Sequence, residues 1–344
     1  MAEYYIAPKS SFDATADAIR EKTGSQATIE WTQDGFADAI EDIPSGWSAD
    51  DIAFGNIAGD VDISGSGVIM SYAFAENQGI TSVSAPNVTR VNERAFSNCR
   101  GITSISLPLC TNIGNYAFYY CSSMKSITLP DSDITLGQSA FYYCWALENV
   151  DFSKINTIPA SCFRDCWAKG CSFNPVTVND SSFRDAEYFG IEYFPRLTTI
   201  NGTYVFAGAY DTSNFCTVDC FVAPALTTMA SSTVLSYCNC LVKIDIGNLT
   251  KIQNETFRAD SNFNVLILRK SGVTELNNIN AFMDTPFGSG KAGGTLYVPQ
   301  SQIAQYEQAT NWSTILGYAN NSIAAIEGSQ YENYYADGTP IPTT

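Results

Sequence analysis

The chain has 344 residues, of which 45% are hydrophobic and 15% charged, a composition typical of a folded protein and not of a disordered one. Its 35 Asp and Glu outnumber its 18 Lys and Arg, and the formal net charge of -17 argues against nucleic acid or an anionic membrane surface as a partner. No histidine is present, which excludes Ser-His-Asp, Cys-His and histidine-metal chemistry.

The two ends of the chain carry no sorting signal. The first five residues, MAEYY, offer neither a basic region nor an apolar core, so we expect no secretory signal. The last six residues, TPIPTT, form no hydrophobic tail, and no apolar run is long enough to span a membrane. These features predict a chain that is made in a cytoplasm, is not exported by the usual route and is not inserted into a membrane.

Residues 1–46 predict a small helical attachment module. Ser11 can cap a first helix, and a second one between Thr32 and Asp42 ends before Pro44. Two short amphipathic helices cannot bury their apolar faces alone, so we expect them to dock on another surface. The apolar side chains predicted to make this attachment are Phe12, Ile19, Trp31, Phe36 and Ile40. Residues 47–67, rich in Gly, Ser and Asp, predict a linker or an irregular first coil.

One phrase then recurs, Ala-Phe-x-x-Cys-x-x-Φ-x-x-Φ-x-Φ-Pro, where Φ is apolar. One copy runs from Ala95 to Pro108 and the next from Ala117 to Pro130. The phenylalanines of successive copies fall 22, 22, 23 and 22 residues apart, at Phe74, Phe96, Phe118, Phe141 and Phe163. A fixed period of this length predicts a solenoid, in which each unit buries its apolar face against its neighbours.

Each coil is expected to hold one short helical turn and one strand. The apolar residues from Ala to the first Φ follow a helical spacing, whereas Φ-x-Φ-Pro alternates as a strand does. We expect about nine coils over residues 68–298. Phe183, Phe206, Leu235 and Phe257 hold the Phe position of the later, less regular coils, and Thr295–Pro299 contains the last predicted strand. Residues 299–344 predict a C-terminal cap and tail, with Ile303, Tyr306 and Trp312 turned inward.

The cysteines follow the repeat. Cys99, Cys121, Cys144 and Cys166 occupy one slot, so we expect a reduced ladder of small buried side chains. Two other groupings have the residue types of a thiolate zinc site: Cys162, Cys166 and Cys171, and Cys216, Cys220, Cys238 and Cys240. Neither shows C-x-x-C spacing, and we predict no metal site and no cofactor.

Three stretches resemble known families. The segment GNYAFYYCSSMKSITLP at residues 114–130 closely resembles BspA-type leucine-rich repeats, and the likeness extends over roughly residues 68–298. This resemblance implies a binding protein, since family members are mostly bacterial surface adhesins. Residues 10–43 resemble a short module at the start of phage and prophage structural proteins, particularly tail proteins, and residues 295–313 are similar to an ending found with such repeats.

Two surfaces are candidates for partner contact. Side chains that flank the repeated Phe and Cys are expected to point away from the core, in an aromatic row made of Tyr119, Tyr120, Tyr142, Tyr143, Trp145 and Trp167. Such a row is typical of a receptor contact, but it also fits packing between coils or cover by a partner subunit. Along the strands, outward positions form a polar ladder that equally fits a solvated sheet face: Ser104, Ser106, Ser126, Thr128, Asn149 and Asp151.

Together these features and resemblances predict a non-enzymatic phage virion protein of the tail fibre or baseplate. The module at residues 1–46 would join other virion proteins, and the repeats would recognise a bacterial surface glycan or protein. A head or collar decoration protein and a bacterial BspA-like adhesin are the alternatives, and a polysaccharide depolymerase with paired carboxylates is an enzymatic one. No heptad run demands an oligomer, and a homo-oligomer stays open.

Overall fold

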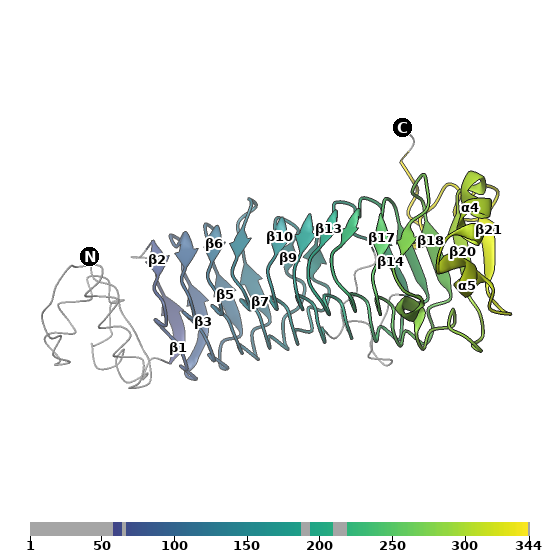
Figure 1. Cartoon of the computed structure of the whole chain (residues 1–344). Helices are drawn as coiled ribbons and strands as arrows, with labels where there is room; N and C mark the ends of the chain where they lie inside the picture. Colours follow the sequence, from purple (N-terminus) through teal and green to yellow (C-terminus); the bar gives the residue numbers. More distant parts are fainter. Residues whose placement is uncertain (1–57, 64–66, 187–192, 209–218, 343–344) are drawn as a thin grey trace, which may run out of the picture. The chain divides into compact units, whose positions relative to one another are not determined.

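The structure is a computed structural model that describes residues 58–63, 67–186, 193–208 and 219–342. The predicted attachment module, with Phe12, Ile19, Trp31, Phe36 and Ile40, lies outside the described residues. The chain divides into two compact units, Met1–Val150 and Asp151–Thr344, and each is a stack of coils (Figure 1). The sequence-based prediction of a solenoid is confirmed: the described residues form a β-solenoid of about nine coils with few helices.

The first unit holds two parallel ladders, one on each side of its core. The wider ladder has the order β1-β3-β5-β7, and the narrower one β2-β4-β6-β8. The strands are β1 (Gly59–Asp62), β2 (Val68–Ile69), β3 (Ile80–Ser84), β4 (Arg90–Val91), β5 (Ser104–Ser106), β6 (Asn112–Ile113), β7 (Ser126–Thr128) and β8 (Thr135–Leu136). Buried residues such as Ile105 and Ile113 alternate with residues that face outward, and β3 buries two, Ile80 and Val83.

The second unit contains longer strands toward its C-terminal end. Its sheets have the orders β11-β9, β10-β12-β13-β15, β17-β19 and β14-β16-β18-β20-β21. The strands are β9 (Asp151–Phe152), β10 (Thr157–Ile158), β11 (Ser172–Phe173), β12 (Thr177–Val178), β13 (Thr199–Ile200), β14 (Cys220–Ala223), β15 (Thr228–Met229), β16 (Lys243–Ile246), β17 (Lys251–Ile252), β18 (Val265–Leu268), β19 (Glu275–Leu276), β20 (Thr295–Val298) and β21 (Ser322–Ala325).

The repeated phenylalanines form stacked columns inside each unit. In the first unit, ring centroids lie 5.1 Å apart for Phe74–Phe96, 5.5 Å for Phe96–Phe118 and 5.4 Å for Phe118–Phe141. In the second unit, Phe183 stacks in the same way at 5.5 Å from Phe163 and 5.3 Å from Phe206. The sequence period therefore reports a physical contact, since each ring packs on the same residue of the next coil. Leu235 takes the equivalent position in its own coil and is fully buried.

The corner that carries the Phe is a run of tight turns. Along it, backbone N–H groups donate alternately to the next coil and to a carbonyl within the same turn. The N–H groups of Arg94, Phe96 and Asn98 donate to carbonyls of the next coil, at 2.9, 2.8 and 2.6 Å. Those of Ala95, Ser97 and Cys99 donate within the turn, to the carbonyl three residues earlier. Arg94 and Asn98 accordingly have φ of 55° and 64°, and the same two places, two residues before and after the Phe, are left-handed in most coils. The corner thus forms part of the intercoil bonding and is not a separate helix.

The cysteine slot supplies both volume and a donor. Cys99, Cys121 and Cys144 are fully buried. Each thiol donates to the carbonyl of the Phe in the preceding coil: Phe74 at 2.7 Å, Phe96 at 3.1 Å and Phe118 at 3.2 Å respectively. A cysteine therefore suits the slot because it is small and satisfies a buried acceptor. Of the other described cysteines, Cys240 is disulfide-bonded.

We expect the core thiols to be chemically inert while the chain is folded. Burial raises the pKa of Cys121 to about 12 and raises that of Cys99 well above its usual value, so almost no thiolate is present at pH 8. Iodoacetamide followed by peptide mass spectrometry should leave both residues unmodified in the native chain and modify them in guanidinium. Labelling of Cys121 at the same rate in both conditions would contradict a reduced, packed ladder.

Two helices close the C-terminal coils. They are α4 (Ile303–Gln308) and α5 (Trp312–Leu316), preceded by the short helices η1 (Ile279–Phe282) and η2 (Gln300–Gln302). Tyr306 and Trp312 are buried, as expected, and bond the backbone beside β19: the Tyr306 hydroxyl accepts from Thr274 N at 2.9 Å, and Trp312 Nε1 donates to Thr274 O at 2.7 Å. Ile303 is half-buried. The sequence-based prediction that Thr295–Val298 is the last strand was wrong, because β21 extends this sheet by one further strand.

Candidate functional site

Five of the six predicted aromatic residues lie together at the corner of the first unit. Tyr116, which was not among the predicted residues, lies with them. We call this group the aromatic patch: Tyr116, Tyr119, Tyr120, Tyr142, Tyr143 and Trp145. The tyrosines are half-buried and Trp145 is 36% exposed. The group is therefore neither a core cluster nor a set of freely moving surface side chains.

The rings of the aromatic patch hold one another in place. Tyr119 meets Tyr142 edge to face at 5.5 Å between centroids, as coil stacking predicts, and Tyr142 stacks on Tyr143 at 4.3 Å. Tyr120 contacts Tyr143 at 5.0 Å and Trp145 at 5.4 Å. Contacts of this kind contribute about 0.5–1.5 kcal/mol each beyond area burial. The aromatic patch is thus preorganised, and a ligand that binds it need not order loose side chains.

The backbone gives no reason for tyrosine at several of these positions. Tyr116, Tyr120 and Tyr143 have φ of 55°, 61° and 62°, in the left-handed region. That region costs an ordinary L-residue about 1–2 kcal/mol and favours glycine or asparagine, and Asn98 fills the place equivalent to Tyr120 in the preceding coil. Tyrosine is therefore present for what its side chain contacts.

Two cations border the aromatic patch. The guanidinium carbon of Arg100 lies 4.4 Å from the centre of the Tyr120 ring, and that of Arg94 lies 4.6 Å from the centre of the Tyr116 ring. Both guanidinium groups lie over aromatic rings at cation–π distance and carry several N–H donors. The aromatic patch therefore combines apolar faces, phenol hydroxyls and guanidinium donors, which is the mixture that binds sugars and polar protein surfaces.

The corner positions differ in the second unit. At the positions equivalent to Tyr142 and Tyr143, its first coils have the ion pairs Arg164–Asp165 (3.4 Å) and Arg184–Asp185 (3.2 Å). Trp167, the remaining member of the predicted row, belongs to the second unit and is 38% exposed. Among the described coils, paired tyrosines directly after the Phe are therefore found at Phe118 and Phe141.

The predicted polar ladder lies on the outer face of the wider sheet. Ser104 and Ser126 are register partners, as are Ser106 and Thr128, and all four side chains point away from the core. Asn149 differs from the expectation: it has a φ of 56° in a bend before β9 and is not part of a strand. Asp151 is exposed at the start of β9, and a hydrogen bond from Ser172 at 2.5 Å lowers its pKa. The ladder shows ordinary outward alternation.

The described residues give little support to a metal site. Among them, no three Cys, Asp or Glu side chains form a group that could hold a metal ion. Cys162, Cys166 and Cys171 are all buried, and burial raises the pKa of Cys166 well above its usual value, which opposes thiolate formation. Cys220 and Cys238 are also buried, and Cys216 lies outside the described part of the chain.

The geometry of the coils matches a known repeat family. The family model described as "BspA type Leucine rich repeat region" matches residues 67–190 in six copies. This part of the chain is a BspA-type leucine-rich repeat region. All the aromatic patch lies inside it, and the C-terminal coils, although stacked in the same way, lie beyond the matched residues.

Three solved structures are similar to this chain at low identity. A leucine rich cell surface protein from Faecalibacterium prausnitzii A2-165 is 14% identical, with 83% of this chain and 91% of that chain covered and a TM-score of 0.44. A leucine-rich repeat protein from Bacteroides ovatus ATCC 8483 is 17% identical, with coverages of 80% and 86% and a TM-score of 0.38. The pneumococcal vaccine antigen PcpA is 14% identical, with coverages of 78% and 90% and a TM-score of 0.36.

A search among curated proteins found no match. In the part of the chain that the structure describes, no helix has the length and apolar character needed to cross a bilayer.

Proposed function

We propose that this chain is a non-enzymatic binding protein whose BspA-type repeats recognise a glycan or protein on a bacterial surface through the aromatic patch. The observation that carries the proposal is the group of tyrosines held in left-handed turns, where the backbone favours other residues. The bordering arginines Arg94 and Arg100 add donors for hydroxyl, carboxylate or carbonyl groups of the ligand. Aromatic and arginine side chains are also those that most often dominate binding energy.

The binding role is tested by a double variant, Tyr142→Ala with Trp145→Ala. We expect cell binding to weaken at least about tenfold, because two contact rings are lost. The melting temperature should fall moderately, since Tyr142 is half-buried and both rings contact other rings of the aromatic patch, but the chain should stay folded. Fluorescently labelled protein is first screened against a panel of bacterial cells and their purified surface polysaccharides, and the variant is then titrated on the strains that bind.

The matched control is Tyr237→Ala. Tyr237 occupies, in a later coil, the left-handed turn position that Tyr143 holds in the aromatic patch, with a φ of 62° and 44% exposure, and it lies outside the aromatic patch. Binding should be retained by this control. Equal binding by the native chain and the double variant, or no binding to any strain, contradicts the proposal.

The finer proposal places the chain on a phage tail fibre or baseplate, where it would contact other virion proteins through residues 1–46. The support is the resemblance of residues 10–43 to phage structural proteins. A head or collar decoration role and a bacterial surface adhesin are the alternatives, and the BspA-type family match is compatible with the adhesin. Cryo-electron microscopy of purified particles distinguishes them: density at the tail tip supports the proposal, density on the head or collar favours decoration, and absence from particles favours the adhesin.

A further inference from the structure

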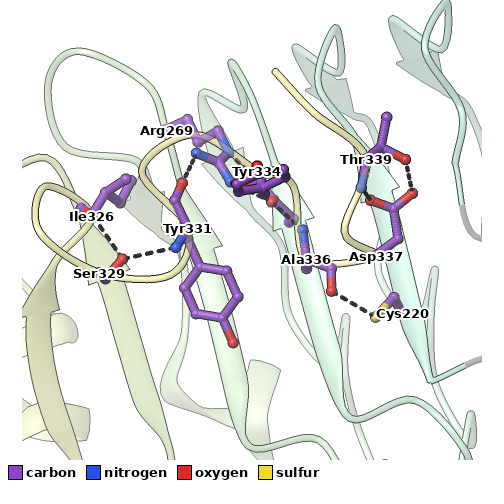
Figure 2. Close-up of polar contacts among 10 residues, drawn as sticks. Cys220, Arg269, Ile326, Ser329, Tyr331, Tyr334, Ala336, Asp337 and Thr339 are labelled. Atoms are coloured by element: carbon purple, nitrogen blue, oxygen red, sulfur yellow. Dashed lines mark hydrogen bonds and ion pairs between the residues drawn. The ribbon is translucent and has the colours of Figure 1, made fainter.

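The C-terminal segment folds back over the sheet that precedes it. After β21, residues 326–341, which we call the strap, cross the outward face of the sheet β14-β16-β18-β20-β21 (Figure 2). Near its end the strap makes a small hairpin, in which Tyr335 N donates to Thr339 O at 2.9 Å and Tyr334 bridges Pro340. The strap is therefore an ordered piece of structure on the sheet face.

The face beneath the strap is largely apolar. Outward positions of the strands hold Cys220, Val222, Val265, Ile267 and Tyr297, with Lys243 and Asp245 between them on β16. The outward positions of β3, β5 and β7 in the first unit hold Ser and Thr. The strap covers this face with its own aromatic residues: Tyr331 meets Tyr297 at 4.9 Å, and Tyr335 meets Tyr193 at 5.6 Å. The apolar cover explains why these strands lack the usual alternation.

A buried ion pair lies at the centre of the contact. Asp245 of β16 is fully buried, and Arg269, just after β18, donates to both of its carboxylate oxygens at 2.7 Å. Arg269 also donates to the carbonyls of Tyr331 at 2.9 Å and Tyr334 at 3.0 Å. The Ala336 N–H donates to Asp245 at 3.0 Å. The three hydrogen bonds that the pair makes to the strap all involve strap backbone, and the Arg269 guanidinium also lies over the Tyr335 ring, 5.1 Å from its centroid.

Backbone recognition of this kind is how proteins bind peptides. Side chains of the sheet recognise an extended segment through its carbonyl and N–H groups, and apolar positions accept its larger side chains. The Cys220 thiol adds a fourth backbone contact, to Ala336 O at 3.3 Å. The strap thus occupies the sheet face as a tethered peptide ligand would.

Residues 327–330, at the start of the strap, form a short and largely exposed tether to β21. Glu327, Gly328 and Gln330 are exposed, and Gly328 has a φ of +76° with open space around the position of a missing Cβ. A different path at this glycine would redirect the strap without unpacking a core residue. The same strap contacts could then form on another copy of the sheet face.

We propose that the sheet face beneath the strap is a docking site for the strap of a second copy of this chain, so that two copies exchange straps reciprocally. The exchanged dimer keeps every contact of the Asp245–Arg269 pair and changes only the tether, which is the condition for exchange at low cost. This inference goes beyond the proposed function. It would place two aromatic patches in one particle and strengthen binding to a repetitive surface through avidity.

A disulfide trap tests strap exchange in the full-length chain. One chain carries Cys220→Ala and Ala336→Cys with an affinity tag, and its partner keeps Cys220 and Ala336 without a tag. Under mild oxidation, a tagged–untagged covalent dimer forms only when the first chain's strap lies on the second chain's sheet. Non-reducing electrophoresis after incubation of the two chains together should show this dimer accumulating, and Ala336→Ser in place of Ala336→Cys should abolish it.

Arg269→Ala in both chains should speed the appearance of the dimer at least about tenfold, since several charge-assisted hydrogen bonds that hold the strap are lost. If Arg269→Ala leaves the rate of dimer formation unchanged, the proposal is overturned, because release of the strap is then not a step in forming the dimer. The proposal is equally overturned if Ala336→Cys alone forms an intrachain bond to Cys220 while mixed chains give no covalent dimer.

Should the intrachain bond fail to form, tagged and untagged native chains are incubated together and captured on the tag. Co-capture of untagged chain that Arg269→Ala accelerates supports exchange, and its absence overturns it. Cell binding by the aromatic patch is measured separately, so a failure of either proposal leaves the other intact.

Discussion

Replacing Phe118 with alanine is expected to lower the free energy of unfolding by about 3–5 kcal/mol, the usual cost of removing a fully buried phenylalanine. The ring is inaccessible to solvent and is stacked between Phe96 at 5.5 Å and Phe141 at 5.4 Å. Its removal leaves a cavity that faces two coils at once. The corner cannot collapse into this cavity, because the N–H of Phe118 is bonded to Ala140 O at 2.9 Å.

Guanidinium unfolding followed by circular dichroism gives the size of the loss. Hydrogen exchange with mass spectrometry locates it, since a repeat protein can lose coils separately. The control is Tyr237→Ala, which removes an aromatic ring that is 44% exposed and should cost less than about 1.5 kcal/mol. Equal losses in the two variants would show that the phenylalanine column does not hold the coils together.

Gly247→Ala is expected to cost about 3 kcal/mol or more, although it adds a single methyl group. A Cβ at this position would lie 1.6 Å from the carbonyl oxygen of Pro224 and 2.5 Å from its carbonyl carbon. Both atoms belong to the backbone of the preceding coil, so no side-chain movement can relieve the overlap. Relief requires β16 to move away from β14, with which it is paired over four residues.

Gly67→Ala is the matched control for this glycine. Nothing lies within 4 Å of its Cβ position, and its backbone is outside the left-handed region. We expect the free energy of unfolding of Gly67→Ala to be unchanged or raised by up to about 1 kcal/mol, because alanine lowers the conformational entropy of the unfolded chain. If the two variants changed the free energy of unfolding by the same amount, the contact between Gly247 and the Pro224 backbone would not be the cause of the loss.

The solenoid could be predicted from sequence because the contacts that build it repeat with the chain. Each Phe packs on the next Phe and each Cys bonds a Phe carbonyl, so identical residues recur at the positions that touch. The left-handed corners were missed, because Tyr116 and Tyr120 are not residues that indicate such turns. The buried Ala, Phe and Cys of each repeat are spaced as on one face of a helix, and the consecutive turns produce the same spacing over this short stretch.

The strap could not be predicted in the same way, because residues 326–341 contain no repeat and contact the sheet only once. Asp245 alternates with Ile244 and Ile246 as a solvated strand position would, and only the tail buries it. A signal was nevertheless present in Val265–Leu268, a strand that is apolar on both faces. Such a run indicates that something covers the outer side.

The aromatic patch was only partly accessible from sequence. The flanking positions of Tyr119, Tyr142 and Trp145 follow from the repeat, and so does the Tyr119–Tyr142 contact. Tyr116 and Arg100 join the aromatic patch through turn geometry that the sequence pattern does not encode. Whether these rings bind a ligand remains for the Tyr142→Ala and Trp145→Ala variant to test.

The alternating bonds of the corners bear on how such a chain changes in length during evolution. Phe74 N bonds Ala95 O, and Phe96 N bonds Ala117 O, so successive coils are joined at one constant offset. Duplication or loss of one whole coil preserves every such bond, whereas a shift of one residue within a corner would break them. The single extra residue before Phe141 is tolerated because it lies in the loop between β7 and β8. Relatives of this chain should therefore differ by whole coils or in these loops.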